Sequence, residues 1–463
     1  MVLCPVILAA GLGKRMHSQS PKVLHCIGGK PLLEHIVLTA SQLGSPHQPI
    51  VIYGHQGAAL RRHLAHLSVT WVEQREQLGT GHALLHALPH LPDNSHVLVL
   101  YGDVPLITAR TLQHLIQQTK ENALGIITAR LRDPAGLGRI VRDDKNKIIS
   151  IIEEKDLLQT QKTMNEINSG IYLIPEKYLR EWLPKLHNDN AQHEFYLTDL
   201  ISIAVQNNIS IHSIEPFDEE EILGVNNRQQ LSTLERFYQK QGAEKLMLQG
   251  TTLLDPERFD LRGEAHIGQD VVIDINVILE GNVTIGHGCV IGPHTVLRNA
   301  VIGDHVEIKA YSIIDGAEIA NHCVIGPFAR LRPGTVLSEN AHVGNFVEVK
   351  NSMIGTATKI NHLSYIGDSE IGKQVNIGAG TITCNYDGVN KHKTVIADHA
   401  FIGSNTALVA PVTIGEAATI GAGSTITNDA PAKQLTLGRA KQLTILHWQR
   451  PEKKELSEKI EKE

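Results

Sequence analysis

His362 is a residue whose type and setting could support chemistry. It lies with Tyr365 in the stretch INHLSYIGDSEIGKQVNIGAGT, which runs from Ile360 to Thr381 and otherwise repeats aliphatic residues and glycines. Histidine can take up a proton near neutral pH, as a general base must when an amine attacks a thioester. The sequence contains 25 histidines, so His362 by itself could equally be a solvated turn residue.

Two cations and one loop accompany His362 in the same half of the chain. Arg332 in ARLRPG and Lys350 in FVEVK occupy related positions of the repeat. Two cations on adjoining coils suit a sugar phosphate, although most such side chains are simply solvated. The segment CNYDGVNKHK interrupts the repeat, and insertions into solenoids often form loops on the binding face. Three polar residues of this segment are Asn385, Tyr386 and Lys391.

A second set of candidate residues lies near the start of the chain, in LAAGLGKRM. A glycine-rich turn after a first strand favours a phosphate cradle made of backbone N–H groups, although an ordinary tight turn has the same pattern. It is neither a P-loop nor a dinucleotide fingerprint, because Met16 stands where the latter needs glycine. The cations Lys14, Arg15 and Lys22 favour phosphate binding, because they would lower the barrier for two phosphates to meet.

Asp103 follows the apolar segment VLVLY and is a candidate metal ligand. It would lie just past the carboxyl end of a strand, where a doubly wound sheet places its site. Magnesium is usually held by one or two carboxylate or amide oxygens together with substrate phosphates. The alternative is a turn-capping role for Asp103 before Pro105.

The elements that must position these residues have different periods in the two halves. In the second half an aliphatic residue recurs every six positions, with a few slips, from Ile267 to Ile426. Six residues suit one short strand and one turn, and three such faces make a coil of about 18 residues, with glycines permitting the turns. This period predicts a parallel β-helix, in which aliphatic side chains of successive coils stack, and it accounts for an aromatic content of only 4%.

The first half alternates apolar strands with helical segments. PVILAA, PIVIYG, HVLVLYGD and LGIITAR read as strands, and PLLEHIVLTASQLG, TGHALLHAL and TARTLQHLIQQTK read as helices. This alternation predicts an α/β domain with a mostly parallel sheet. We expect domains at 1–227 and 251–463, joined by a helix at 228–250. The tail from Arg450 is rich in charge and is expected to be solvated.

Composition excludes several classes of protein. A net charge of −6 argues against nucleic-acid binding, for which a basic excess is typical. Five scattered cysteines without CxxC spacing suit reduced thiols in a cytosol and argue against a structural zinc site. The apolar start lacks the basic region of a signal peptide, and no apolar run approaches the ~18 residues of a membrane span.

The first half resembles the sugar-nucleotide pyrophosphorylases, which are nucleotidyltransferases. With its hexapeptide half, the chain resembles the bacterial bifunctional N-acetylglucosamine-1-phosphate uridyltransferase/glucosamine-1-phosphate N-acetyltransferases, from PVILAAG to GRAKQ. The resemblance implies a Rossmann-like domain followed by a left-handed β-helix. It implies acetyl transfer from acetyl-CoA to glucosamine 1-phosphate. Mg²⁺-dependent transfer of the uridylyl group from UTP to N-acetylglucosamine 1-phosphate would follow. This second reaction would release pyrophosphate and make UDP-N-acetylglucosamine, a precursor of peptidoglycan and lipopolysaccharide. A cytoplasmic homotrimer is also implied.

The resemblance further implies roles for residues at matching motifs. His362 would be the catalytic base, and Asp103 and Asn226 would hold magnesium. The nucleotide and sugar would contact Leu8, Ala9, Ala10, Gly11, Arg15, Lys22, Gln74, Gly79, Thr80, Tyr101, Gly102, Asp103, Gly138, Glu153, Asn168 and Asn226. Glucosamine 1-phosphate would contact Arg332, Lys350, Tyr365, Asn376 and Lys391. Acetyl-CoA would contact Ala379, Asn385, Tyr386, Ser404, Ala422 and Arg439.

Two positions depart from the family pattern or leave it ambiguous. Lys14 replaces the usual threonine of the glycine loop, which removes one hydroxyl contact, and Glu154 follows Glu153, so that the sugar contact could shift by one residue. Two alternatives remain. A single-activity enzyme such as an ADP-glucose pyrophosphorylase would not need the residues around His362. A non-catalytic scaffold, as in some translation-factor subunits, would be expected to lack Asp103, Lys22 or the glycine loop.

Overall fold

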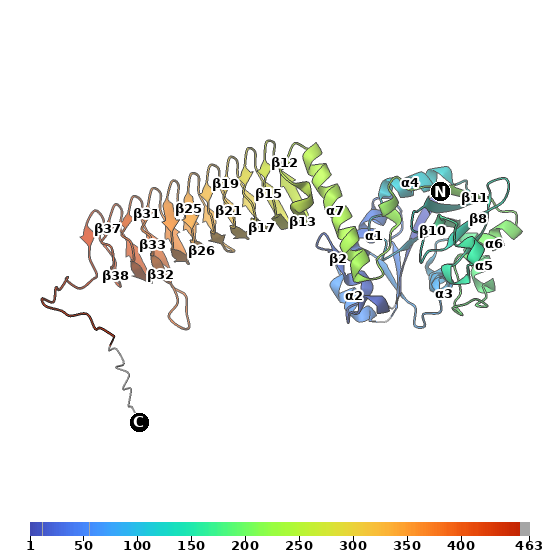
Figure 1. The fold of residues 1–463 in the computed structure, drawn as a ribbon, viewed down its shortest axis with the longest axis horizontal. Helices are drawn as coiled ribbons and strands as arrows, with labels where there is room; N and C mark the ends of the chain where they lie inside the picture. Colours follow the sequence, from blue (N-terminus) through green and yellow to red (C-terminus); the bar gives the residue numbers. More distant parts are fainter. Residues whose placement is uncertain (12, 55, 454–463) are drawn as a thin grey trace, which may run out of the picture. The chain divides into compact units, whose positions relative to one another are not determined.

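The computed structural model describes residues 1–11, 13–54 and 56–453. It forms two compact units, Met1–Ala300 and Val301–Glu463, whose elements are labelled in Figure 1. The charged tail lies outside the described residues from position 454 onward, so most of its predicted solvation is not addressed by the structure.

The first unit contains a mixed sheet in the order β11-β7-β10-β6-β1-β4-β5. Neighbouring strands are parallel except at β10, which runs antiparallel to β6 and β7. The four strands predicted from the sequence are β1, β4, β6 and β7. The strand bounds are β1 Val2–Ala9, β4 Ile50–Tyr53, β5 Thr70–Glu73, β6 Ser95–Tyr101, β7 Leu124–Arg130, β10 Glu166–Pro175 and β11 Ile211–Ile214, with β8 Arg139–Arg142 and β9 Ile148–Ile152 at the side and the hairpin β2 Cys26–Ile27 and β3 Lys30–Pro31 apart from it.

Helices cover both faces of this sheet, which explains why strands such as β1 and β4 are almost uniformly apolar. Along β1, Val6 and Leu8 belong to one buried cluster, and Ile7 between them belongs to another. The first cluster includes side chains of α3, α5 and α6, and the second includes side chains of α1, α2 and α4. The helix bounds are α1 Leu32–Ser41, α2 Gly57–His63, α3 Thr80–Leu85, α4 Ala109–Gln118, α5 Glu176–Trp182 and α6 Asp199–Gln206. The three helices predicted in this half are α1, α3 and α4.

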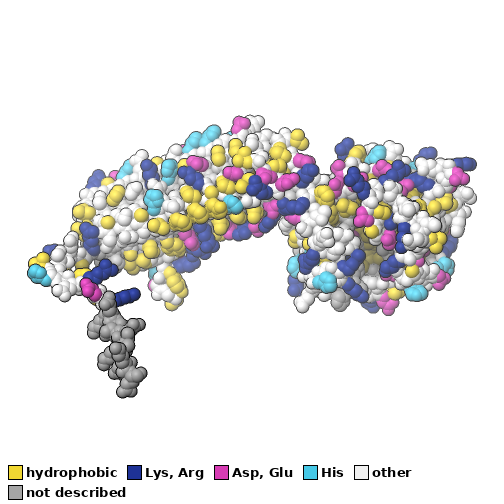
Figure 2. Space-filling view, viewed as in Figure 1, with side chains coloured by type: hydrophobic (Ala, Val, Ile, Leu, Met, Phe, Trp, Pro, Cys, Tyr) yellow, Lys and Arg dark blue, Asp and Glu magenta, His cyan; other side chains and the backbone are white. Residues whose placement is uncertain are grey.

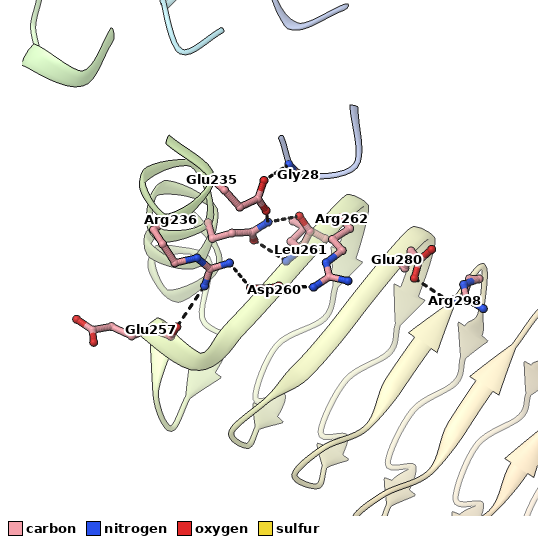
Figure 3. A network of polar contacts seen from close by, with 10 residues as sticks. Gly28, Glu235, Arg236, Glu257, Asp260, Leu261, Arg262, Glu280 and Arg298 are labelled. Atoms are coloured by element: carbon pink, nitrogen blue, oxygen red, sulfur yellow. Dashed lines mark hydrogen bonds and ion pairs between the residues drawn. The ribbon is translucent and has the colours of Figure 1, made fainter. Parts of the chain in front are cut away.

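Helix α7, Arg228–Leu248, lies in the first unit between the hairpin and the first coil (Figure 3). Its buried Gln239 donates to the carbonyl of Leu261 at 3.0 Å and accepts from that residue's N–H at 2.6 Å, which fixes the helix to β13. On the other side, Glu235 accepts a hydrogen bond of 2.9 Å from the N–H of Gly28. A Cβ at Gly28 would lie 2.0 Å from the ring of Tyr238, so only glycine fits there.

Coils of short parallel strands make up the rest of the described chain. In the first unit the strands are β12 Thr252–Leu253, β13 Phe259–Ile267, β14 Val272–Ile273, β15 Val277–Ile285, β16 Val290–Ile291 and β17 Val296–Arg298. In the second unit they are β18 Val301–Ile302, β19 Glu307–Ile308, β20 Ile313–Asp315, β21 Glu318–Ile319, β22 Val324–Ile325, β23 Arg330–Leu331, β24 Val336–Leu337, β25 His342–Asn345, β26 Glu348–Lys350, β27 Met353–Ile354, β28 Lys359–His362, β29 Tyr365–Gly367, β30 Ser369–Ile371, β31 Asn376–Ile377, β32 Ile382–Cys384, β33 Thr394–Ile396, β34 Phe401–Ile402, β35 Ala407–Val409, β36 Val412–Ile414, β37 Thr419–Ile420, β38 Thr425–Ile426 and β39 Leu435–Thr436.

The predicted aliphatic repeat is the stacked core of these coils. Val343 pairs with Ile360, which pairs with Ile377, and all three side chains are almost completely buried. Each coil is therefore held to the next by backbone hydrogen bonds and by apolar contact between side chains in the same position.

The predicted role of the glycines is partly wrong. Several corners of the coils use other residues at positive φ, such as Phe328 at 57° and Leu363 at 50°. Gly355, which follows an aliphatic residue, has no such φ, but a Cβ there would lie 2.4 Å from the carbonyl carbon of Gly372. Glycine is required at this position because the next coil approaches closely, and not because the backbone is left-handed.

In the part of the chain that the structure describes, no helix combines the length and apolar character needed to cross a bilayer.

Candidate functional site

A cavity of about 550 Å³ opens in the first unit at the carboxyl ends of β1, β5 and β6. Parallel strands bring these ends to one edge of the sheet, which is where such folds place their ligands. Ten residues of the predicted nucleotide site line the cavity: Leu8, Ala9, Ala10, Gly11, Lys22, Gln74, Gly79, Thr80, Tyr101 and Asp103.

Lys22, Asp103 and Asn226 meet at this cavity. The ammonium of Lys22 forms an ion pair with the Asp103 carboxylate and donates to the Asn226 amide oxygen at 3.1 Å. The distant Asn226 reaches this position because the N–H of Val225 donates to the carbonyl of Asp103 at 2.8 Å. Two oxygens, one carboxylate and one amide, thus converge on a single positive charge.

This donor pair fits a magnesium ion. Mg²⁺ takes few protein oxygens and completes its shell with water and substrate phosphates. Among the described residues, no group of three or more His, Cys, Asp or Glu side chains is arranged to hold a metal by itself. A metal at Asp103 and Asn226 would therefore depend on the phosphates of a bound substrate for further ligands.

The glycine-rich turn packs directly against Lys22. Gly13 has a φ of +60°, and a Cβ there would lie 2.8 Å from the Cβ of Lys22. The turn ends in a short helix at Lys14–Met16, where Arg228 donates to the carbonyl of Met16 at 3.2 Å. Lys14 lines the cavity, whereas Arg15 is exposed and does not. Leu12 of this turn lies outside the described residues.

The predicted sugar contacts form a connected set behind Tyr101. A Cβ on Gly138 would lie 3.6 Å from both carboxylate oxygens of Glu153, and the carbonyl of Gly138 accepts from the N–H of Asn168 at 2.9 Å. The pKa of Glu153 is raised, mainly by burial and further by the charges of nearby acidic groups. A hydrogen bond from Thr198 lowers this pKa but does not outweigh the other effects.

Glu153 is better placed for this set than Glu154. Glu154 forms an ion pair of 2.9 Å with Arg139, a side chain that is only 3% exposed. Burial raises the pKa of Tyr101, and the negative charges of Glu153 and Asp103 raise it further, so the hydroxyl stays protonated as a donor.

In the second unit, His362 stands in line with residues that occupy the same position in the following coils. This column includes most of the predicted acetyl-CoA contacts. Strand register sets Ala379 above His362, then Ser404, then Ala422, each one coil further along. Arg439 donates to the carbonyl of Ala422 at 2.8 Å and so lies at the end of the column. The interrupted repeat at 385–393 forms the loop between β32 and β33 that projects from the coils in Figure 1.

His362 is exposed, and its ring is oriented by Asn345 of the preceding coil. Nδ1 of His362 lies 3.2 Å from the amide oxygen of Asn345, which orients the ring and leaves Nε2 outside this contact. His362 and Asn345 also line a groove of about 390 Å³ together with Lys309, His342 and Asn361. A base is thus presented at a hollow in the surface.

Cations gather beside this column. Arg332 and Lys350 are stacked in neighbouring coils, as predicted from their phase, and Arg332 pairs with Glu348 at 2.8 Å. Lys391 from the projecting loop reaches Lys350, and this contact with a second positive charge lowers the pKa of Lys391. Tyr365 lies next to them, with its hydroxyl 2.5 Å from where a Cβ on Gly367 would be.

Asp368 and Asn385 close this cluster. Burial raises the pKa of Asp368, but hydrogen bonds from Asn351 and Asn385 and the charges of Lys350 and Lys391 outweigh it and lower the pKa overall. One amide hydrogen of Asn385 is therefore committed to Asp368, which leaves one for a ligand. Asn376 lies apart from the cations, at the start of β31.

Known proteins match nearly the whole chain. The MobA-like NTP transferase domain matches residues 5–252, the GMPPB C-terminal domain residues 261–345, and the bacterial transferase hexapeptide model residues 393–428. The bifunctional protein GlmU of Marinobacter nauticus is 52% identical over 448 residues, which cover 97% of this chain and 98% of that protein. The bifunctional protein GlmU of Nitrosospira multiformis is also 52% identical, over 450 residues and the same shares of both chains.

The chain belongs to the GlmU family.

This confirms the predicted family resemblance, the nucleotidyltransferase fold followed by a left-handed hexapeptide β-helix, and the bifunctional transferase class. A solved nucleotidyl transferase from Methanothermobacter thermautotroptrophicus covers 51% of this GlmU-family chain and 97% of its own, at 16% identity and a TM-score of 0.38, a likeness too low to support a conclusion.

Sequence reasoning missed several residues of the first cavity in this GlmU-family chain. Lys155 and Gln192 belong to segments without a recognisable motif, and they are joined by a hydrogen bond of 2.5 Å. Gln77 lies between Gln74 and Gly79, two residues that the family resemblance had already named. The lining residues not singled out are Val23, Gln77, Ala83, Lys155, Gln192 and Glu194.

Proposed function

We propose that this chain carries out its two transferase reactions at two separate sites, one in each unit. The chain is a bifunctional enzyme that makes UDP-N-acetylglucosamine by acetyl transfer to glucosamine 1-phosphate and uridylyl transfer to the product. The observation that carries the two-site proposal is the pair of independent constellations, around Lys22, Asp103 and Asn226, and around His362.

Uridylyl transfer is proposed for the cavity of the first unit. The 1-phosphate of N-acetylglucosamine attacks the α-phosphorus of UTP in line, and pyrophosphate leaves. Lys22 and the N–H groups of the glycine turn hold the triphosphate. Asp103 and Asn226 would hold Mg²⁺, which supplies charge neutralisation at the phosphates. The residues of the chain otherwise act by position and charge, because this direct in-line attack requires no covalent enzyme intermediate.

Acetyl transfer is proposed at the column above His362. Nε2 of His362 accepts a proton from the amine of glucosamine 1-phosphate as the amine attacks the thioester carbonyl. The carbon–sulfur bond then breaks, and the same proton passes to the departing sulfur, so that coenzyme A leaves as the thiol. The remaining amide hydrogen of Asn385 is a candidate donor to the oxyanion. Ala379, Ser404 and Ala422 offer a surface of small side chains along which an extended acetyl-CoA can lie.

The cation cluster is the proposed phosphate anchor of this site. Arg332, Lys350 and Lys391 lie close together, and without an anion the positive charges of the two lysines repel each other. The phosphate of glucosamine 1-phosphate would neutralise that repulsion. Tyr365 and Asn376 are proposed to contact the sugar itself.

A homotrimer is proposed for the assembly, supported by an exposed aromatic ladder in the second unit. The rings of Tyr311, Phe328 and Phe346 stack at centroid distances of 5.0 and 5.1 Å, and they are 49%, 45% and 54% exposed. Leu363, adjacent to His362, continues this column and is 62% exposed. Figure 2 shows exposed hydrophobic side chains in a band along the coils. Such contiguous patches mark interaction surfaces.

A cytoplasmic location is also proposed. Its support is chemical: none of the cysteines at 4, 26, 289, 323 and 384, all within the described residues, forms a disulfide.

The experiment that tests the proposed function measures coenzyme A thiol release from acetyl-CoA in the absence of UTP. Glucosamine 1-phosphate is the acceptor, glucosamine 6-phosphate is the control, and pyrophosphate release from UTP and N-acetylglucosamine 1-phosphate is measured separately. Thiol release with the 1-phosphate only, together with pyrophosphate release, is the expected result. Pyrophosphate release without thiol release would leave a single-activity nucleotidyltransferase with a structural solenoid.

A further inference from the structure

Gln74 stands out in the first cavity because it is buried, polar and only partly hydrogen-bonded. It follows β5 immediately, lines the cavity and is 2% exposed. Its amide nitrogen donates to the carbonyl of Gly79 at 3.3 Å and lies 2.9 Å from Nδ1 of His82. Its amide oxygen has no hydrogen-bond partner among the described residues.

The orientation of this amide follows from the chemistry of its neighbours. The carbonyl of Gly79 can only accept, so the group facing it must be the NH₂ of Gln74. The second hydrogen of that NH₂ points to Nδ1 of His82, which accepts it only if the imidazole is neutral and protonated on Nε2. With both hydrogens engaged, the amide oxygen of Gln74 is the atom left for a ligand in the cavity.

We propose that His82 is a positioning residue that sets the base selectivity of the uridylyl site by locking the Gln74 amide with its oxygen toward the cavity. This rests on the proposed function, in which Gln74 faces the base of UTP. His82 lies on α3 and does not line the cavity, so it acts only through Gln74.

The locked amide distinguishes uracil from cytosine. Uracil carries a hydrogen on N3, which can be donated to the amide oxygen of Gln74. Cytosine has a lone pair on N3, which would face that oxygen without a hydrogen between them. An amide free to rotate would present its NH₂ to cytosine instead. Rotation is opposed because it would turn the oxygen toward two acceptors, Gly79 O and His82 Nδ1, and unpaired buried groups are costly.

The test compares kcat/KM for UTP and CTP, measured as pyrophosphate release with N-acetylglucosamine 1-phosphate. His82→Phe keeps a ring but removes the acceptor, and we expect the UTP:CTP ratio to fall about tenfold, as expected for the loss of one buried hydrogen bond. His82→Asn places an oxygen near the position of Nδ1 and should keep the ratio within about twofold of the unsubstituted enzyme.

The matched control is His86→Asn on the same helix. The His86 ring lies 4.7 Å from that of His82, but no hydrogen bond joins it to Gln74. We expect an unchanged ratio. An unchanged ratio in His82→Phe, or no preference for UTP in the unsubstituted enzyme, would overturn the inference. If His82→Phe does not fold, His82→Leu carries the test, because it also removes the acceptor and must also lower the ratio.

Failure of this inference differs from failure of the proposed function. If the unsubstituted enzyme releases no pyrophosphate from UTP, the proposed function itself is wrong. If it does so with a preference for UTP that His82→Phe leaves intact, only the role of His82 is wrong.

Discussion

The side chains around His362 come from neighbouring coils, whereas those around Asp103 come from segments far apart in the chain. Asn345, His362 and Ala379 occupy the same position in three successive coils. Lys22, Asp103 and Asn226 meet only because a sheet edge, a glycine turn and the residues before α7 converge. In a solenoid, counting residues therefore predicts neighbours. In the α/β fold, proximity depends on how the sheet is assembled.

The largest effect is expected for His362→Ala. Loss of a general base should lower acetyl transfer by about 10²–10⁴-fold, while uridylyl transfer stays near normal because its residues lie in the first unit. Coenzyme A thiol release and pyrophosphate release, measured on the same preparation, check this. His322→Ala, an exposed histidine of another coil, is the matched control. Loss of both activities in His362→Ala would break the comparison between two independent sites.

Asp103→Asn should reverse that pattern. The substitution removes the carboxylate that pairs with Lys22 and that is proposed to hold Mg²⁺. We expect uridylyl transfer to fall by about 10²-fold, in line with losing a main electrostatic contact, and acetyl transfer to be retained. Pyrophosphate release measured over a range of Mg²⁺ concentrations is the assay. An unchanged rate at every concentration would remove Asp103 from the metal site.

Phe328→Glu tests whether the second site needs more than one chain. A carboxylate in the middle of the exposed aromatic ladder should disrupt self-association, because charges are disfavoured in the core of an interface. Sedimentation should then show smaller particles, with acetyl transfer reduced about tenfold or more and uridylyl transfer unchanged. Met353→Glu on β27, which is 57% exposed, is the control. A trimer that withstands Phe328→Glu would argue against the ladder as the interface.

The smallest effect is expected for Lys391→Met. Lys350 remains as a cation, so the KM for glucosamine 1-phosphate should rise only about tenfold, with kcat little changed. Contact with Lys350 lowers the pKa of Lys391, so Lys391 loses its positive charge at a lower pH than an ordinary lysine does. As the pH rises, the unsubstituted enzyme should therefore begin to lose affinity for glucosamine 1-phosphate earlier than an enzyme with an ordinary lysine there. A KM that is the same with and without Lys391 would exclude it from the phosphate anchor.

Much of the fold was accessible from the sequence. The apolar runs that became β1, β4, β6 and β7 are buried on both faces, and such strands have an unmistakable composition. By contrast, nothing in the sequence of β10, EINSGIYLIP, indicated that it would insert antiparallel between β6 and β7. Strand direction depends on connections and neighbours, and these are properties of the assembled sheet.

Candidate residues show the same division. The stacking of Arg332 and Lys350 followed from their phase in the repeat. The contact of Lys22 with both Asp103 and Asn226 was not predicted, although the resemblance had named all three residues. The contact between His82 and Gln74 was not predicted either, because a short spacing in sequence says nothing about which ring nitrogen meets which amide atom.

The sequence by itself determined the two periods, and with them a sheet covered by helices and a stack of six-residue strands, because burial of apolar side chains at a regular spacing admits few backbones. It also determined which residue types were available for proton transfer and phosphate binding. Only the tertiary structure decided which oxygens share the Lys22 ammonium, which amide side chains His362 and His82 face, and that Glu154 is paired with Arg139. Those outcomes depend on hydrogen-bond geometry between distant segments, and that geometry exists only once the chain has folded.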